Sequence, residues 1–206
     1  ILQGAVDGLP ICRGIADTLV SVLAAAVANI IFVVQPDLVV VGDNASTDGT
    51  GAALKALQWE PLGVVDTGDN LGNAGGVRVA MDRAFSQGAD AVWILDDDSW
   101  PRAGALEALL EGGFDPAIVR HCLQIDPSGG QYSWPLLVRG GGGGWDTIRH
   151  PDEWPGGERV ESRGSWTGAL VPRAAWEKAG PVLGELFIRG EDEEYPRRIA
   201  MAGFGF

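Results

Sequence analysis

Short apolar runs separated by polar turns dominate the first half of the chain. The runs at residues 38–41, 63–66 and 91–95 are mostly apolar, and each ends at or directly before a glycine or an aspartate. Short apolar runs of this kind are typical of buried parallel strands. The pattern therefore predicts three strands, with Asp43 and the acidic run 96–98 at their carboxyl ends.

Two helices are predicted between these strands. Residues 51–58 follow a turn of small polar residues, and a second helix ends at Gly88. The apolar positions of the second helix recur at helical spacing: Val77, Ala80, Met81, Ala84 and Phe85. Alternating strands and helices predict an α/β fold, a mostly parallel sheet flanked by helices in a single domain. Such sheets bind ligands beyond the carboxyl ends of their strands.

The second half has a looser pattern. Helices are predicted at residues 102–111 and 172–179, with a strand within 116–126. Residues 126–163, which include a run of five glycines, are predicted to be mostly loop and hairpin. A last helix is predicted to begin near Glu191 and to carry Ile199 and Phe204 on its apolar side.

One apolar stretch, residues 18–34, is similar in composition to a membrane-spanning helix. A bilayer crossing needs about 20 apolar residues, and this stretch has 17 without basic flanks. We therefore expect a buried helix here and no membrane span.

Composition narrows the functional classes. The chain has 206 residues, 46% of them hydrophobic, and a net charge of −13. That charge disfavours binding to nucleic acid or to anionic lipid, although a divalent cation can bridge an acidic protein to a phosphorylated ligand. Two cysteines, Cys12 and Cys122, exclude a disulfide scaffold and a four-cysteine zinc site.

The run Asp96-Asp97-Asp98 is the first candidate site. Adjacent carboxylates repel one another, and their hard oxygen atoms suit Mg²⁺ or Mn²⁺. A solvated acidic turn explains the same residues without any ligand. From this run alone, both interpretations stay open.

The segment from Asp43 to Gly49 is the second candidate. A calcium loop is excluded, because the twelfth position from Asn44 is Lys55 where a glutamate is needed. Asp43 or Asn44 could accept or donate hydrogen bonds at a nucleobase edge, or the segment could be a plain turn that caps a helix.

The glycine-rich segment 70–76 is the third. It does not match the G-x-G-x-x-G pattern of dinucleotide-binding proteins, which argues against a nicotinamide dehydrogenase. Its glycines could admit a diphosphate at a helix N-terminus, or form a simple tight turn.

Four acidic residues, 191–194, open the last helix. They complement the helix dipole, and one of them could instead be a general base. Tryptophans such as Trp166 could stack on a sugar ring, although most tryptophans are core or rim residues.

These segments, in this order, resemble the family 2 glycosyltransferases of the GT-A fold. Residues 39–50, VVVGDNASTDGT, look like the nucleotide-binding turn of the family. Residues 69–101, with NLGNAGG and AVWILDDDSWP, look like its second half-site and its DxD motif. Residues 165–204 contain GALV and FIRGEDEEY, which are similar to the acceptor end of the bacterial rhamnosyl- and galactofuranosyltransferase branch.

The resemblance implies roles for individual residues. Asp192 matches the catalytic base. The nucleotide-sugar positions are Asp43, Asn44, Asn70, Gly72, Asn73, Gly76, Asp96 and Asp97. Asp96 and Asp98 match the metal-binding positions, and the acceptor-site candidates are Trp166, Glu191 and Arg198. Pro196 departs from the small polar residue that is usual there and is expected in the first turn of the helix, where proline is tolerated.

The resemblance also implies an activity. We expect an inverting, Mg²⁺- or Mn²⁺-dependent transferase that moves rhamnose or galactofuranose from a UDP- or dTDP-linked donor. The acceptor is expected to be a cell-surface glycan or a lipid-linked glycan, reached from the cytoplasm or the cytoplasmic face of the membrane. Residues 1–101 would bind nucleotide and 102–206 the acceptor, in a domain truncated at both ends. The alternative is a relative that binds sugar or nucleotide without catalysis.

Overall fold

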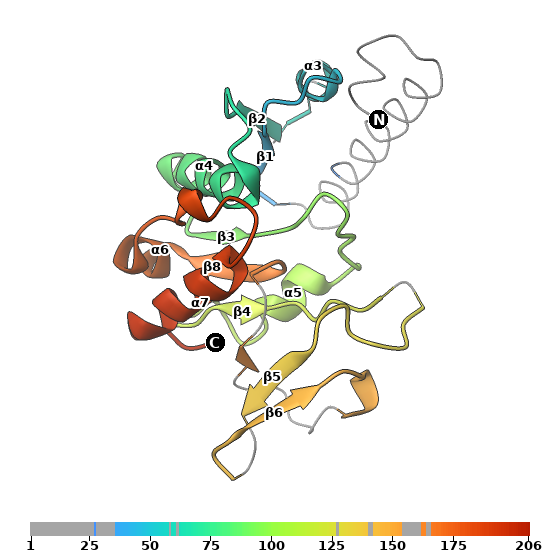
Figure 1. Cartoon of the computed structure of the whole chain (residues 1–206), viewed down its shortest axis with the longest axis vertical. Helices are drawn as coiled ribbons and strands as arrows, with labels where there is room; N and C mark the ends of the chain where they lie inside the picture. The colour runs from blue at the N-terminus through green and yellow to red at the C-terminus, as the bar shows by residue number, and fades with distance from the viewer. Residues whose placement is uncertain are drawn as a thin grey trace. The chain divides into compact units, whose positions relative to one another are not determined.

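The computed structural model describes residues 27, 36–57, 59–60, 62–126, 128–139, 142–153, 162–163 and 166–206. The chain divides into two compact units. The first comprises Ile1–Ala89, Asp96–Ala108 and Val182–Arg189, and the second comprises Asp90–Leu95, Leu109–Pro181 and Gly190–Phe206. Figure 1 gives the order of the elements along the chain.

The first unit contains a parallel strand pair. Strand β1 (Val39–Asp43) pairs with β2 (Leu62–Asp66), and the register runs from Val39 opposite Leu62 to Asp43 opposite Asp66. Helix α3 (Thr50–Ala56) connects them, as the pattern predicts. Both strands therefore end at the same edge, with an aspartate at the end of each.

Helix α4 (Gly72–Ser86) follows β2 and packs on β1 (Figure 1). Met81, Ala84 and Phe85 are buried, which confirms the predicted apolar face. The short 3-10 helix η3 (Gly184–Leu186) returns from late in the chain to pack on α4. Val27, Val39 of β1 and Leu54 of α3 are buried together in a separate apolar cluster, against which Leu62 and Val64 of β2 pack.

The second unit is built around an antiparallel sheet. Strand β8 (Ala169–Pro172) lies between β3 (Ala91–Trp93) and β4 (Arg120–His121) and runs antiparallel to both (Figure 1). All four residues of β8 are buried. Among the described residues, the only parallel pairing between strands is that of β1 with β2. The predicted mostly parallel sheet is therefore not confirmed.

The sequence pattern predicts β3 but not its antiparallel pairing with β8, and this difference has a physical reason. The partner of β3 arrives about 75 residues later in the chain, as the bond from Trp93 to Gly168 illustrates, and no local pattern records it. The run Ala-Leu-Val is as apolar as the predicted strands, but it is short and leads directly into the helix that follows Pro172. Its apolar pattern alone therefore does not predict a strand.

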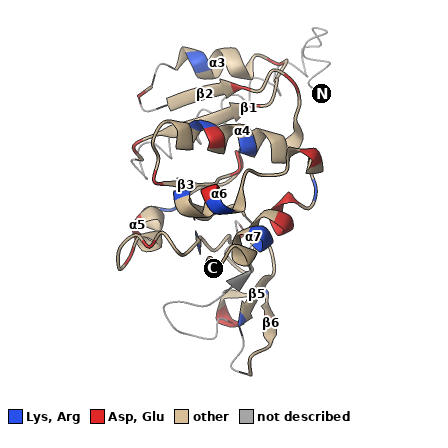
Figure 2. Cartoon of the chain, turned by 90° about the vertical axis from the view of Figure 1, so that its left-hand side faces the viewer, with Lys and Arg blue, Asp and Glu red and all other residues tan. Residues whose placement is uncertain are grey.

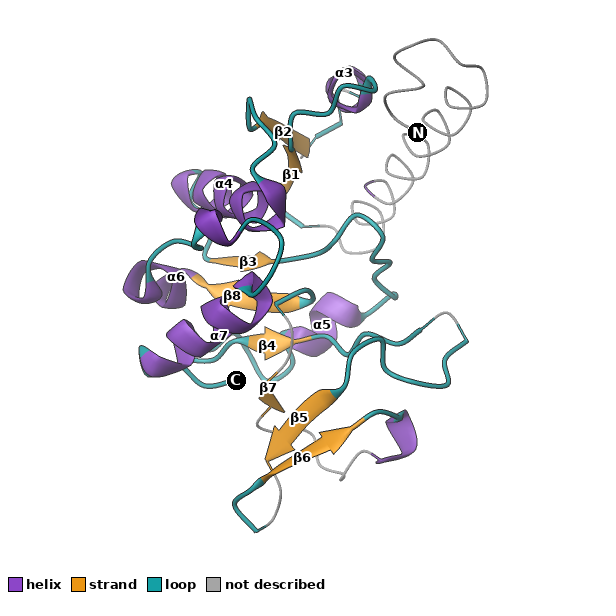
Figure 3. Cartoon of the chain, in the orientation of Figure 1, coloured by secondary structure: helices purple, strands orange, loops and turns teal. Residues whose placement is uncertain are grey.

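The middle of the second unit is a hairpin, as predicted. Strands β5 (Leu136–Arg139) and β6 (Trp145–Ile148) pair antiparallel, and β7 (Ser162–Arg163) joins the other edge of β5 (Figure 3). Tyr132, Val138 and Ile148 form its small core. A single 3-10 turn, η2 (Pro151–Glu153), follows β6.

Three helices complete the described elements. Helix α5 (Ala105–Leu109) is shorter than predicted, and α7 (Glu191–Met201) begins at the predicted residue. Helix α6 (Arg173–Ala179) begins one residue later than predicted, because Pro172 is the last residue of β8. Ile199 is buried on α7, but Phe204 lies beyond the end of the helix. Gly203, with a φ of 96°, adopts the left-handed conformation that terminates helices, which explains this error.

Pro196 lies further into the helix than the sequence predicts. It is an interior residue of α7, in the second turn and not in the first. Proline has no N–H, and its ring crowds the carbonyl of the residue four positions earlier, which is Asp192. An interior proline costs a helix about 3 kcal/mol, yet α7 continues to Met201.

The apolar stretch 18–34 lies outside the described residues except for Val27. That residue is helical and buried. Among the helices that the structure describes, none is long and apolar enough to cross a bilayer.

Candidate functional site

Asp43 ends β1 and turns inward. Its side chain is only 6% exposed, and its Oδ1 accepts a hydrogen bond of 3.0 Å from the main-chain N–H of Ser46. Gly51 of α3 faces this carboxylate so closely that a Cβ at position 51 would overlap its Oδ2. The glycine is therefore a steric requirement of the Asp43 position.

Asn44 connects the end of β1 to the loop after β2. Its Nδ2 donates to the Oδ1 of Asn70 at 3.1 Å and to the carbonyl of Gly72 at 3.0 Å. Its Oδ1 accepts from the N–H of Leu71 at 2.8 Å. Both amide protons and one oxygen lone pair of Asn44 therefore hold the loop that leads into α4.

Thr67 supports the same junction and was not predicted. Its main-chain N–H donates to the carbonyl of Asp43 at 3.0 Å, and its hydroxyl lies 2.7 Å from the carbonyl of Asp69. The sequence did contain a signal. Thr67 directly follows β2, at the strand end where a parallel sheet gathers its polar residues.

The N-terminus of α4 is capped from within the first unit. The N–H of Gly72 donates to the Oδ1 of Asn70 at 3.0 Å, and the N–H of Ala74 donates to the carbonyl of Phe187 at 2.9 Å. Gly72 has a φ of 68°, and a Cβ there would overlap the Phe187 carbonyl. Asn73 is exposed, and Gly76 faces the amide of Asn44. The roles of Asn70, Gly72, Asn73 and Gly76 towards nucleotide stay predictions.

The acidic run follows β3. The N–H of Ser99 donates to the carbonyl of Asp96 at 3.0 Å, which closes a turn over the three aspartates. Asp97 and Asp98 are exposed, and Asp96 is half-buried. The turn therefore presents two carboxylates to solvent.

The acidic run offers carboxylate oxygens, the hard ligands that Mg²⁺ and Mn²⁺ prefer. Across the described ranges, no three His, Cys, Asp or Glu side chains converge as a ready-made cage. Mg²⁺ at nucleotide sites is usually held by one or two carboxylates together with substrate phosphates and water. Half-buried Asp96 and exposed Asp98, which follow a strand end, fit a cation of that kind, shared with a diphosphate.

In the second unit, the first turn of α7 separates two neighbouring acids. Glu191 is 3% exposed, whereas the side chain of Asp192 is exposed to solvent. The N–H of Glu194 donates to the carbonyl of Gly190 at 2.8 Å, so the helix is formed from its first residue. Figure 2 shows this acidic turn with basic residues further along the helix. Of the two acids, Asp192 is the one that is accessible to solvent.

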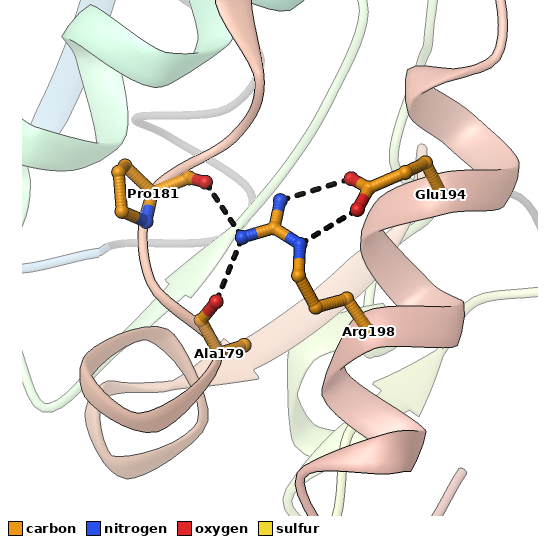
Figure 4. Close-up of polar contacts among 4 residues, drawn as sticks. All are labelled: Ala179, Pro181, Glu194 and Arg198. Atoms are coloured by element: carbon orange, nitrogen blue, oxygen red, sulfur yellow. Dashed lines mark hydrogen bonds and ion pairs between the residues drawn. The ribbon is translucent and has the colours of Figure 1, made fainter.

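Arg198 anchors α7. Its guanidinium makes a two-point pair with Glu194, Nε to Oε1 at 2.7 Å and Nη2 to Oε2 at 2.9 Å. Its Nη1 donates to the carbonyls of Ala179 at 2.7 Å and Pro181 at 2.9 Å, at the end of α6 (Figure 4). The side chain therefore binds groups of the protein itself. Its predicted role towards the acceptor stays a prediction.

Trp166 is 2% exposed, so its ring lies in the interior of the second unit. The turn that follows it is held from two sides. The carbonyl of Gly168 accepts from the Trp93 indole at 3.1 Å and from the N–H of Cys122 at 2.9 Å. In this conformation, Trp166 presents no ring face to solvent for a sugar.

Comparison with known proteins is consistent with the motifs. The sequence profile of glycosyl transferase family 2 matches residues 12–177. The galactofuranosyltransferase GlfT1 of Mycolicibacterium smegmatis is 28% identical over 185 residues, covering 84% of this chain and 58% of that protein. GlfT1 of Mycobacterium tuberculosis strain H37Rv is 30% identical over 184 residues, covering 83% and 57%. The chain thus spans less than two thirds of the length of these relatives.

The profile covers the loops that follow β1 and β2 and the acidic run 96–98, and it ends before α7. The matched region is more than half of the chain. By this match, the protein is a member of family 2 of the glycosyltransferases.

Proposed function

We propose that the chain is the catalytic part of an inverting, metal-dependent glycosyltransferase that uses a nucleotide-diphosphate sugar. The observation that carries the proposal is Asp192. It is an exposed carboxylate on the first turn of a helix that a half-buried arginine anchors. A general base needs this combination of access and fixed position.

In the proposed reaction, Asp192 accepts the proton of an acceptor hydroxyl. The hydroxyl oxygen bonds to the anomeric carbon from the face opposite the diphosphate, and the bond from that carbon to the diphosphate oxygen breaks. The electron pair leaves with the diphosphate. A single displacement inverts the anomeric configuration and needs no covalent bond to the enzyme.

Asp96 and Asp98 are the residues that would hold the cation. When bound, Mg²⁺ or Mn²⁺ would neutralise the charge that develops on the departing diphosphate. The net charge of the chain is −13, so a cation would offset the repulsion between its carboxylates and a diphosphate. Asp43 ends β1 and Asn44 follows it, at the edge where parallel strands gather ligand-binding residues, which supports a nucleotide site there.

The names of the relatives favour galactofuranose as the donor sugar, with rhamnose as the alternative. The nucleotide is then UDP for galactofuranose or dTDP for rhamnose. We propose a growing or lipid-linked cell-surface glycan as acceptor. The reaction would take place in the cytoplasm or at the cytoplasmic face of the membrane, where activated donors are available.

Calorimetry of UDP and dTDP binding, with Mn²⁺ and with EDTA, tests the metal part of the proposal. We expect binding with Mn²⁺, and loss of most of that affinity in EDTA and in Asp98→Asn. The matched control is Asp152→Asn, which removes an exposed carboxylate from η2. Equal nucleotide affinity with Mn²⁺ and with EDTA would contradict the proposed metal dependence.

A further inference from the structure

Helix α7 carries a defect next to the proposed base. Pro196 lies inside the helix and has no N–H to donate. The helical acceptor for that position is the carbonyl of Asp192, four residues earlier. The backbone at Asp192 therefore lacks a bond that any other residue at position 196 would supply.

Arg198 and Glu194 span this defect. They lie on either side of Pro196, one helical turn apart, and form a two-point pair at 2.7 and 2.9 Å. Both side chains are half-buried, which limits the screening that weakens exposed ion pairs. The pair adds a side-chain link between positions 194 and 198, next to the backbone bond between positions 192 and 196 that the proline removes.

The same guanidinium ties α7 to a second element. Ala179 is the last residue of α6, so its carbonyl is one of the acceptors that a helix end leaves unpaired. Arg198 donates to it at 2.7 Å and to the carbonyl of Pro181 at 2.9 Å (Figure 4). A cation is also favourable at the C-terminus of a helix. Buried Tyr195, whose ring centroid lies 5.1 Å from the Arg198 Cζ, packs beside the guanidinium.

We propose that Arg198 is a positioning residue for Asp192. It holds the proline-containing helix against the end of α6, and so fixes the helix turn that carries Asp192, without touching the acceptor. This inference rests on the proposed function, in which Asp192 is the base. It differs from the role in acceptor binding that the sequence predicts for Arg198.

The test compares Arg198→Met with Arg197→Met, which removes a charge from the adjacent, exposed position of the same helix. Small displacements of a catalytic group cost up to about 100-fold in rate. We expect Arg198→Met to lower kcat by ~10- to 100-fold, with the nucleotide Kd and the acceptor KM within about twofold of wild type. Arg197→Met should remain near wild type. Arg198→Lys should recover only part of the rate, because an ammonium cannot reproduce the two-point pair.

Pro196→Ala is the rescue variant. It restores an N–H for the Asp192 carbonyl, so Pro196→Ala combined with Arg198→Met should regain part of the lost kcat. A rise in acceptor KM with unchanged kcat in Arg198→Met would overturn the inference and make Arg198 an acceptor ligand. Unchanged kcat and KM in a folded Arg198→Met would also overturn it.

Hydrogen exchange separates this inference from the proposed function and needs no activity. Loss of the Arg198 contacts should speed amide exchange in residues 192–195 by at least ~10-fold relative to Arg197→Met, because local opening becomes easier. If the wild type transfers no sugar but exchange changes as expected, the proposed function fails and the anchoring of α7 stands. If exchange in residues 192–195 is unchanged, the inference fails. Should Arg198→Met not fold, Arg198→Lys is measured in its place.

Discussion

Individual residues at the end of β1 are fixed by close contacts from elsewhere in the first unit. Asp43 fits its buried position because Gly51 has no side chain, and Asn44 holds the loop before α4 through three hydrogen bonds. Each contact has a consequence for stability that can be measured.

Gly51→Ala should destabilise the protein. Replacing glycine by alanine inside a helix normally stabilises by about 0.5–1 kcal/mol. At position 51 the new Cβ would overlap the Asp43 carboxylate, so we expect a net loss of about 1–3 kcal/mol from this overpacking. Urea denaturation measures the difference.

Gly76→Ala is the matched control for this substitution. Its Cβ would lie 3.8 Å from the Asn44 Cγ, an ordinary contact, so the normal helix preference should make the variant as stable as wild type or more so. A Gly51→Ala protein that gains stability as Gly76→Ala does would contradict the structure around Asp43.

Cys122 should be unreactive in the folded protein. Burial raises the pKa of its thiol from 9.0 to about 11. The thiolate fraction at pH 8 is then ~100-fold lower than for an ordinary cysteine, and the thiolate is the reactive form. Iodoacetamide labelling with peptide mapping should show slow alkylation of Cys122 until the protein is denatured.

The same shift has a consequence for stability. Because the folded-state pKa lies above that of the unfolded chain, the contribution of this thiol to stability is present below about pH 9. It is lost as the pH rises towards 11.

In the labelling experiment, alkylation of native Cys122 at the rate of the denatured protein would contradict its burial.

At the scale of elements, the junction between η3 and α4 rests on Gly72. Gly72→Ala introduces two penalties, a left-handed φ of 68° and overlap with the carbonyl of Phe187 that caps Ala74. We expect a loss of about 2–4 kcal/mol, from strain of about 1–3 kcal/mol plus the disturbed cap. Thermal or urea denaturation measures it.

Gly88→Ala separates the two penalties. Gly88 also has a positive φ, 97°, but no atom lies within 4 Å of the point that a Cβ would occupy there, so only the conformational strain applies. The difference between the two variants isolates the close approach of Phe187. Equal losses would show that this approach does not constrain position 72.

The elements also show what local sequence can predict. Strand β1, strand β2, α4 and the start of α7 follow from apolar spacing and from turn residues, which are local properties. The pairing of β3 with β8 depends on segments about 75 residues apart, so the sequence pattern predicts the strand and misses its partner.

The residues of the candidate site likewise fall into those that the local sequence predicts and those that depend on distant contacts. The sequence places Asp43 at a strand end and Asp192 at a helix start, where the structure has them. It does not predict Thr67, Gly51 or the cap from Phe187, because their roles depend on contacts with distant residues. Arg198 is recognised as important, but its partners Ala179 and Pro181 lie 17 to 19 residues away.

At the scale of the whole molecule, the proposed nucleotide residues and the proposed base belong to different compact units. Asp43, Asn44 and Asp96–Asp98 fall in the first, and Asp192 with its anchor Arg198 falls in the second. An asparagine at position 192 keeps the shape of the side chain but cannot accept a proton, so Asp192→Asn should lower catalysis and leave donor binding intact.

The measurement is sugar transfer by the full chain with Mn²⁺, from UDP-galactofuranose and dTDP-rhamnose to a glycan acceptor. We compare wild type, Asp192→Asn and the neighbouring Glu193→Gln, with donor Kd measured in parallel. Loss of a general base costs about 10²–10⁴-fold. We predict that Asp192→Asn loses transfer to this extent while its donor Kd stays within about twofold, and that Glu193→Gln keeps its activity. Near-wild-type turnover by Asp192→Asn would contradict the account.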